Sequence, residues 1–249
     1  MAKFCKTCGK PLSFFSGLFR SICNECSQKR IPDPKMPALH TSNLLSNHNF
    51  TTEIGGEIAY FGLENWWINE LTQEEREIIF SIYQPFGLSK DSLIKGKITY
   101  SSQTTTGFLT GLLSWFKKPE YQHISTKIIK QIESRSPKKG SVMDRHFFLT
   151  TKIQTFYRNR DTDNSALGSA TEACKELIDL SPAAKRAFLR EYPNSPLPSH
   201  VGYNQLCVIL EKQKNYDEVI RLAKKAKTQG WMGDWDKRID RCMKKQKSQ

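Results

Sequence analysis

Apolar residues recur at helical spacing through most of the second half of the chain. Ile124, Ile128 and Ile132 lie four residues apart, and similar spacing continues toward the end of the sequence. Apolar side chains that recur every three or four residues share one side of an α-helix. The pattern from residue 120 onward therefore predicts an almost continuous series of helices.

The first clear helix start lies earlier, at Thr72. Thr72 and Glu75 have the spacing of a capping box, and Pro85 is expected to end this helix. Trp66 and Trp67 precede it, and we expect both to pack into the core. Residues 51–64 contain several glycines and predict either one short strand or an irregular lead-in.

Further helix boundaries are marked by prolines and polar residues. Ser181 followed by Pro182 is typical of an N-cap and the first helical position, so a new helix is expected to begin there. A loop is predicted over 194–199. Helices are predicted over 201–214 and 217–228, and a last helix with the apolar stripe Trp235, Ile239 and Cys242.

Residues 107–116 form an apolar stretch followed by two lysines. Such a segment can lie on a membrane surface, but a buried helix or loop is the simpler interpretation. No apolar run reaches the roughly 18 residues that a membrane-spanning helix needs, and we expect no membrane span.

Four cysteines near the start form two C-x-x-C pairs, Cys5 with Cys8 and Cys23 with Cys26, separated by 14 residues. Four thiolates at this spacing can close a tetrahedral site around one structural zinc ion. Such a short segment buries little core, so the metal would supply most of its folding free energy. Disulfides are the main alternative, and an iron–sulfur centre or a redox dithiol is a lesser one.

The surroundings of the cysteines bear on the compartment. No signal-peptide pattern opens the chain, and thiols arranged for a metal suit a reducing environment, so we expect a cytoplasmic protein. Cys174, Cys207 and Cys242 stand singly among apolar neighbours. We expect these three to be small core residues rather than ligands or nucleophiles.

These patterns divide the chain into four parts. Residues 1–30 would hold the metal, and the proline-containing residues 31–50 would form a flexible linker. Residues 51–160 would form a mainly helical domain of unknown type, followed by a second helical region over 161–249. The expected fold class is mainly α.

The hairpin near the C-terminus resembles a tetratricopeptide repeat. Large and small residues alternate on its first helix, an aromatic residue occupies the turn, and small residues fill the second helix: Tyr203, Leu206, Cys207, Leu210, Tyr216, Val219, Ala223 and Ala226. Cys207 and Val219 depart from the usual small residues, and no proline ends the unit. The resemblance implies a helical groove that binds a protein or peptide, although a plain α-hairpin in an all-α domain would look similar.

The first 30 residues resemble a zinc ribbon. Cys8 is followed by Gly9, as is usual in this module, whereas Cys26 is followed by Ser27. A zinc ribbon ahead of a helical region is similar to the arrangement of some bacterial proteins. The resemblance implies that Cys5, Cys8, Cys23 and Cys26 hold the metal and that this module binds nucleic acid or protein.

The net charge of +13 is uneven, with about +5 on residues 1–30, −2 on 31–119 and +10 on 120–249. In the last predicted helix Lys237, Arg241 and Lys244 lie on one stripe and are candidate phosphate contacts. A charged outer face of a helical scaffold is the plainer interpretation.

No sequence motif indicates catalysis. The chain has no glycine-rich phosphate loop, H-E-x-x-H or G-x-S-x-G, and its five histidines are scattered. His146 falls on an apolar helical side and is expected to be a satisfied core residue. The sequence therefore predicts a non-enzymatic, zinc-binding adaptor that binds a protein or peptide, with nucleic-acid binding as the alternative.

Overall fold

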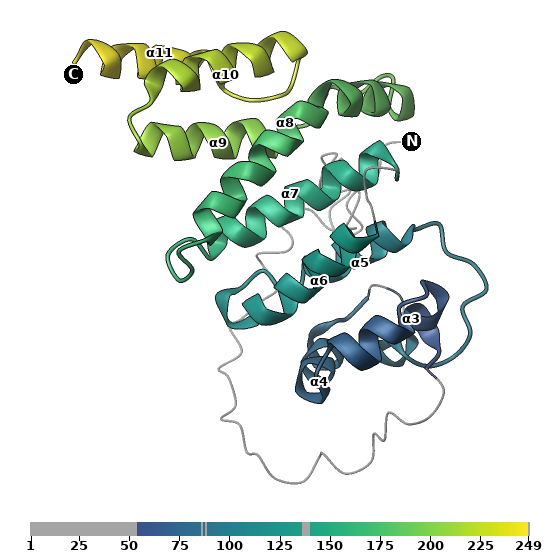
Figure 1. Cartoon of the computed structure of the whole chain (residues 1–249). Helices are drawn as coiled ribbons and strands as arrows, with labels where there is room; N and C mark the ends of the chain where they lie inside the picture. The colour runs from purple at the N-terminus through teal and green to yellow at the C-terminus, as the bar shows by residue number, and fades with distance from the viewer. Residues whose placement is uncertain (1–53, 86, 88, 136–139, 249) are drawn as a thin grey trace, which may run out of the picture. The chain divides into compact units, whose positions relative to one another are not determined.

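The helices follow from local capping and from the apolar stripes in the sequence. In a computed structural model, which describes residues 54–248 except 86, 88 and 136–139, the protein is mainly α-helical (Figure 1). These described residues contain no β-strand; Ser199 and Met232 form an isolated bridge. The prediction of a mainly α fold is therefore confirmed for the part of the chain that the structure describes.

The first described elements are short. They comprise α3 (Gly56–Tyr60), the π-helical turn η1 (Trp66–Glu70), α4 (Gln73–Ile82), the 3₁₀ turn η2 (Lys90–Leu93) and α5 (Thr105–Leu113). The strand expected as one possibility over 51–64 is wrong, because residues 56–60 form the short helix α3. Gly56 adopts a positive φ of 62° directly beneath the backbone of Ser92, where a Cβ atom would clash. This contact with η2 is remote in sequence, so local patterns did not reveal it.

Helix α4 begins as its sequence predicts. The Thr72 side chain accepts the backbone N–H of Glu75, and the Glu75 carboxylate accepts the backbone N–H of Thr72 at 2.7 Å. Trp66 and Trp67 are buried in the core, as expected. Local capping chemistry thus fixes this boundary.

The apolar stretch over 107–116 is buried within the fold. Phe108, Leu109, Leu112, Leu113 and Phe116 are all at most 2% exposed, and α5 packs against α6 and α7. The buried-helix interpretation is therefore confirmed. No helix in the described residues has the length and apolar character needed to cross a membrane.

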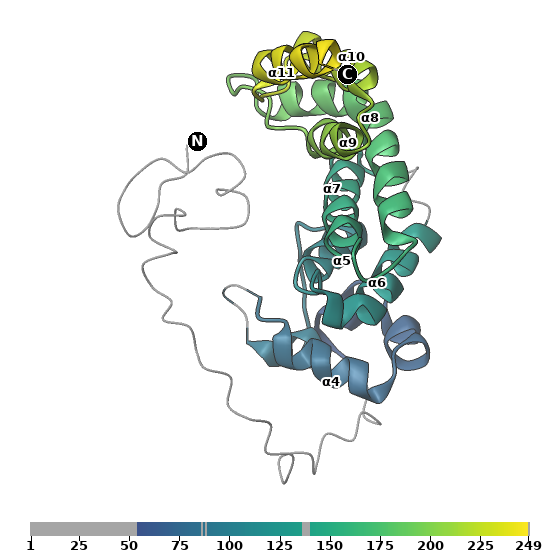
Figure 2. The same cartoon turned by 90° about the vertical axis from the view of Figure 1, so that its left-hand side faces the viewer.

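The central helices pack along apolar stripes. After the 3₁₀ turn η3 (Pro119–Tyr121) come α6 (Gln122–Ser134), α7 (Val142–Arg158) and α8 (Ala166–Glu191). Ile124, Ile128 and Ile132 are fully buried on α6, as the sequence predicts. Helices α7 and α8 share the most extensive helix–helix interface and lie side by side in both views (Figures 1 and 2).

Helix α8 continues through Pro182, so the helix start predicted at Ser181 is wrong. The helix runs unbroken over 26 residues with the proline in its interior. Ser181 is fully buried, and its hydroxyl donates to Gln229 Oε1 at 2.9 Å instead of capping a helix. Tertiary packing has overridden a strong local start signal.

The last three helices are α9 (Val201–Lys212), α10 (Tyr216–Gln229) and α11 (Trp235–Lys247). Each packs against the next, and α9 also packs against α8 and α7. The predicted apolar stripe on α11 is confirmed at Trp235 and Cys242, which are buried, and Ile239 is half-buried. Asp234 precedes α11 but makes no side-chain capping hydrogen bond.

Candidate functional site

Two sets of candidate residues came from the sequence. The proposed zinc ligands Cys5, Cys8, Cys23 and Cys26 lie outside the described residues. The candidate phosphate contacts Lys237, Arg241 and Lys244 lie on α11, all with exposed side chains. The structure therefore bears directly on the second set alone.

Arg241 already has a carboxylate partner. Its Nη2 atom donates to both carboxylate oxygens of Glu211 on α9, at 3.1 and 3.0 Å. Arg238 forms a second ion pair with the same carboxylate at 3.2 Å. Glu211 thus links α9 to α11 and offsets part of the positive charge of the stripe.

Two histidines meet in the core where α7, α8, α9 and the α10–α11 connection converge. The imidazoles of His146 and His200 have ring centroids 5.6 Å apart and are at most 1% exposed. The indole of Trp231 stacks on His146 and lies against His200, with centroid distances of 6.1 and 4.7 Å. Phe188 of α8 contacts the edge of the same group. We call His146, Phe188, His200 and Trp231 the histidine–tryptophan cluster.

His200 also caps α9. Its Nδ1 atom accepts the backbone N–H of Tyr203 at 3.2 Å, which places the proton of the neutral ring on Nε2. Neither His200 Nε2 nor His146 Nδ1 has a well-aligned hydrogen-bond partner among the described residues. The expectation that His146 is a core residue is confirmed, but its hydrogen bonding is incomplete at Nδ1.

Burial keeps both imidazoles neutral at physiological pH. It lowers the pKa of His146 to about 4. Burial, with a smaller contribution from the nearby His146, lowers the pKa of His200 to about 3, although the nearby backbone of Leu177 opposes part of the shift. Both rings are therefore enclosed core groups that are neutral at physiological pH.

A single amide oxygen ties three helices and a connection together beside this cluster. Gln229 Oε1, at the end of α10, accepts hydrogen bonds from Ser181 Oγ, Tyr203 Oη and Trp231 Nε1 at 2.9, 3.2 and 2.8 Å. The donors come from α8, α9 and the α10–α11 connection. The network therefore fixes how the last helices pack on α8.

A buried carboxyl group lies in the first part of the described chain. Tyr83 Oη donates to Glu57 Oε1 at 3.3 Å, while Glu57 Oε2 is buried without a partner among the described residues. Burial raises the pKa of Glu57, although the Tyr83 hydrogen bond offsets part of this effect. Burial and the adjacent Glu57 also raise the pKa of Tyr83. The Tyr83 ring packs edge-on against Phe108 and Trp115, and Glu57 and Tyr83 are each at most 8% exposed.

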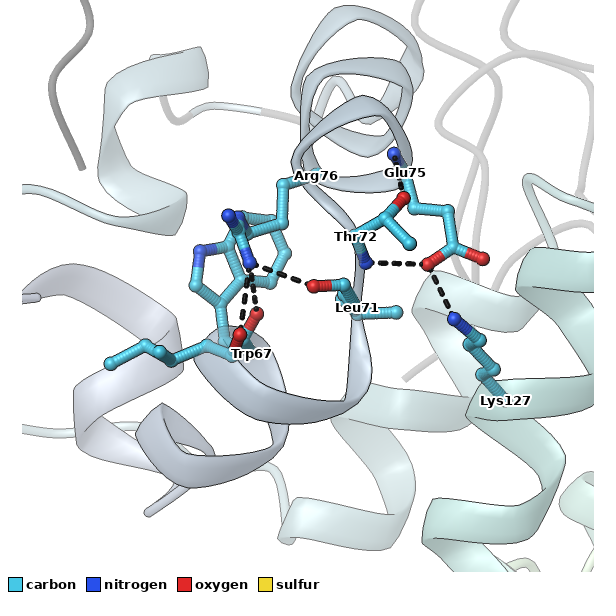
Figure 3. Close-up of polar contacts among 7 residues, drawn as sticks. Trp67, Leu71, Thr72, Glu75, Arg76 and Lys127 are labelled. Carbon is cyan, nitrogen blue, oxygen red and sulfur yellow. Dashed lines mark hydrogen bonds and ion pairs between the residues drawn. The ribbon is translucent and has the colours of Figure 1, made fainter.

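A second polar group joins α4 to α6 (Figure 3). The Glu75 carboxylate accepts from Lys127 Nζ at 2.6 Å as well as from the backbone of Thr72. Burial raises the pKa of Glu75, but these hydrogen bonds outweigh burial and the pKa falls below its usual value. Arg76 Nη1 lies nearby and donates to the carbonyl groups of Trp67, Ile68 and Leu71, which caps the end of η1. These contacts hold the helices in place.

The three single cysteines are buried, as predicted. Burial raises the pKa of Cys174 to about 12 and that of Cys207 to about 11. Thiols in this state carry almost no thiolate at neutral pH and are poor nucleophiles. Within the described part of the chain, no group of three or more His, Cys, Asp and Glu side chains is placed to hold a metal.

An open groove lies between α6, α7 and α8. Ile129 and Phe156 form its apolar floor, and an ion pair of 2.7 Å between Lys152 and Glu133 lies at its side. Charges of both signs line it, and its remaining lining residues are Thr126, Lys130, Ser169 and Glu172. It has no concentration of groups that would select one ligand.

Sequence reasoning missed the histidine–tryptophan cluster and the Glu57–Tyr83 pair. Their members come from segments up to 85 residues apart, so no spacing rule brings them together. The one local signal was His200, which directly precedes a predicted helix and occupies its N-cap. A comparison of the chain with protein families, with curated proteins and with solved structures finds no match.

Proposed function

We propose that this protein is a non-catalytic adaptor whose helical region binds a protein or peptide. A structural zinc ion held by Cys5, Cys8, Cys23 and Cys26 would fold a second recognition module. The spacing of these cysteines supports one closed, four-thiolate site, in which no coordination position is left for a substrate.

The observation that carries the proposal is the contrast between the core and the surface of the described helices. The ionisable groups whose protonation is most strongly altered, including His146, His200 and Cys174, are enclosed. Catalytic acids, bases and nucleophiles must instead reach a substrate. The outer faces of α10 and α11 are open to solvent and strongly charged, which suits recognition.

The packing of α9 on α10 supports the resemblance to a tetratricopeptide repeat. Cys207, Val219, Ala223 and Ala226 are fully buried. The small side chains of Ala223 and Ala226 let the two helices approach closely, as the repeat requires, whereas Cys207 and Val219 are larger than the residues usual at their positions. Helices α8 and α11 pack on either side of this pair, which is the neighbourhood that a repeat needs to bury its apolar sides.

Nucleic-acid binding is the alternative function, and the basic surface of α10 and α11 favours it. The aromatic residues of α9–α11 and their connections argue against a base-stacking platform. Tyr203, Tyr216, Trp231 and Trp235 are each at most 8% exposed, whereas single-stranded nucleic acids usually stack on exposed rings.

A selection from a random peptide display library, with the zinc-loaded full chain as bait, tests the adaptor function. The proposal expects enrichment of related peptides, and bound peptide should slow amide hydrogen exchange in α9–α11. Failure to enrich any related peptides would contradict it. Protection confined to helices before α7 would contradict the proposed location.

A further inference from the structure

The outer surface of α10 and α11 carries more positive charge than its own carboxylates neutralise. Six exposed lysines lie beyond ion-pair distance of any carboxylate among the described residues: Lys224, Lys225, Lys237, Lys244, Lys245 and Lys247. One of these, Lys245, lies over the ring of Tyr216. Lysines without an ion-pair partner on a folded surface are available to an external anion.

Most nearby carboxylates are already engaged. Glu211 holds Arg238 and Arg241, Glu218 pairs with Arg221, and Asp236 pairs with Lys227 at 2.6 Å. Asp217 accepts a hydrogen bond from Gln246. Asp234 and Asp240 are the remaining acidic residues of this surface, and neither lies within ion-pair distance of the lysines. The carboxylates of this surface thus pair mainly with its arginines, and six of its lysines form no ion pair with them.

Lys237, Arg241 and Lys244 form the α11 stripe, because spacings of four and three residues keep them on one side of the helix. At 1.5 Å per residue the stripe spans about 10 Å. In the middle of the stripe, the guanidinium of Arg241 is paired with Glu211. The ammonium groups of Lys237 and Lys244 lie toward its two ends and form no ion pair with any carboxylate that the structure describes. In a peptide of polyproline II conformation, which has three residues per turn and a rise of 3.1 Å per residue, carboxylates three residues apart lie on one side and about 9 Å apart, so the spacings match.

The stripe suits a peptide better than a nucleic acid. Met243 is adjacent to Lys244 and 46% exposed, so it offers an apolar contact that a sugar–phosphate backbone would not use. The buried aromatic rings of α9–α11 leave no platform for bases.

We propose that the α11 stripe binds an acidic segment of a partner protein, with Lys237 and Lys244 each receiving a carboxylate about 10 Å apart. Met243 contacts an apolar side chain of the same segment. The inference rests on the proposed adaptor function and specifies the chemistry of its partner.

The test measures binding of a fluorescent ten-residue polyglutamate peptide to the full chain at low salt. The charge-reversed variant Lys237→Glu/Lys244→Glu should lose about tenfold or more in affinity, since two surface ion pairs become repulsive. The milder Lys237→Gln/Lys244→Gln should lose less. The control Lys97→Glu/Lys130→Glu changes the net charge equally at exposed sites outside α11 and should bind within about twofold of the parent.

The opposing outcomes are distinct. The proposed binding at the α11 stripe would be contradicted if the parent chain did not bind polyglutamate. It would also be contradicted if the control variant lost as much affinity as the α11 variant. A DNA oligonucleotide that binds more tightly than polyglutamate, and is lost in the α11 variant, identifies a nucleic-acid surface instead. In the display selection, enriched peptides that lack Asp and Glu would contradict the acidic partner segment but would still support the adaptor function. A selection that enriches no related peptides would contradict the adaptor function as well.

Discussion

The two buried imidazoles of the histidine–tryptophan cluster give the fold a defined pH dependence. A histidine in the unfolded chain titrates near pH 6.5, whereas the folded pKa values of His146 and His200 are about 4 and about 3. Their contribution to stability is therefore complete above about pH 6.5 and falls as the pH drops toward 3. Each group can contribute up to about 1.4 kcal/mol per pH unit within this range.

Urea unfolding at pH 7 and at pH 5.5 measures this effect. Both pH values lie above the range in which most carboxylates titrate, so the histidines dominate the difference in stability. We expect the parent chain to be less stable at pH 5.5, and His146→Gln to reduce the difference. His200→Asn should reduce it as well while retaining a capping side chain. The exposed His123→Gln is the matched control. The same pH difference in all four proteins would contradict the assignment.

Lys214 is a strained residue between α9 and α10. It adopts a φ of 60°, in the left-handed region that side chains with a Cβ atom disfavour. Lys214→Gly should raise the free energy of unfolding by about 0.5–1 kcal/mol, since glycine adopts this conformation without strain. Lys214→Ala removes the same charge but keeps the Cβ atom. An equal gain from both variants in urea unfolding would show that charge, and not backbone strain, is responsible.

At the scale of an element, Pro182 is the unusual feature of α8. It lies on the exposed side of a continuous helix and cannot donate a hydrogen bond to the carbonyl group of Ile178. Pro182→Ala should restore that bond and raise the free energy of unfolding by about 1–2 kcal/mol, after allowing for the greater freedom of the unfolded chain.

Thermal unfolding beside the exposed control Glu176→Ala checks this prediction. The control should change stability little, because Glu176 is a solvent-facing residue of the same helix. Loss of stability in Pro182→Ala would mean that the proline shapes α8 for the hydrogen bond between Ser181 and Gln229.

Elements with local causes could be predicted from the sequence. The capping box that specifies the start of α4 is contained in the four residues from Thr72 to Glu75. The spacing of the isoleucines in α6 likewise identifies the buried side of that helix. Helix α3 and the continuity of α8 could not be predicted in this way. The first depends on Gly56 fitting beneath Ser92, and the second on Ser181 finding Gln229 of α10.

The same distinction applies to the sites. The α11 stripe was predicted because it lies within eight residues of one helix, but its neutralisation by Glu211 was not, since that residue comes from α9. The histidine–tryptophan cluster unites residues from His146 to Trp231. Contacts of this kind are set by the tertiary fold and leave no periodic signal in the sequence.

At the scale of the whole molecule, we expect the zinc module and the helical region to respond separately to mutation. Cys5→Ser and Cys23→Ser should each abolish zinc binding, because a three-thiolate set leaves the closed site incomplete. The main unfolding transition of the helices should remain. Cys242→Ala is the matched control, since Cys242 is buried in α11 and should leave the zinc content unchanged. Unchanged metal content in both serine variants would refute the ligand assignment.

Native mass spectrometry of the full chain tests the central claim most directly. The protein is purified from cells under reducing conditions, and the ratio of its absorbance at the nucleic-acid and protein maxima is measured on the same sample. The zinc-binding protein adaptor predicts one zinc ion per chain and a spectrum free of nucleic acid. A chain without metal whose mass shows paired cysteines would contradict the zinc module. Co-purifying nucleic acid that dissociates at high salt would contradict the protein-binding function.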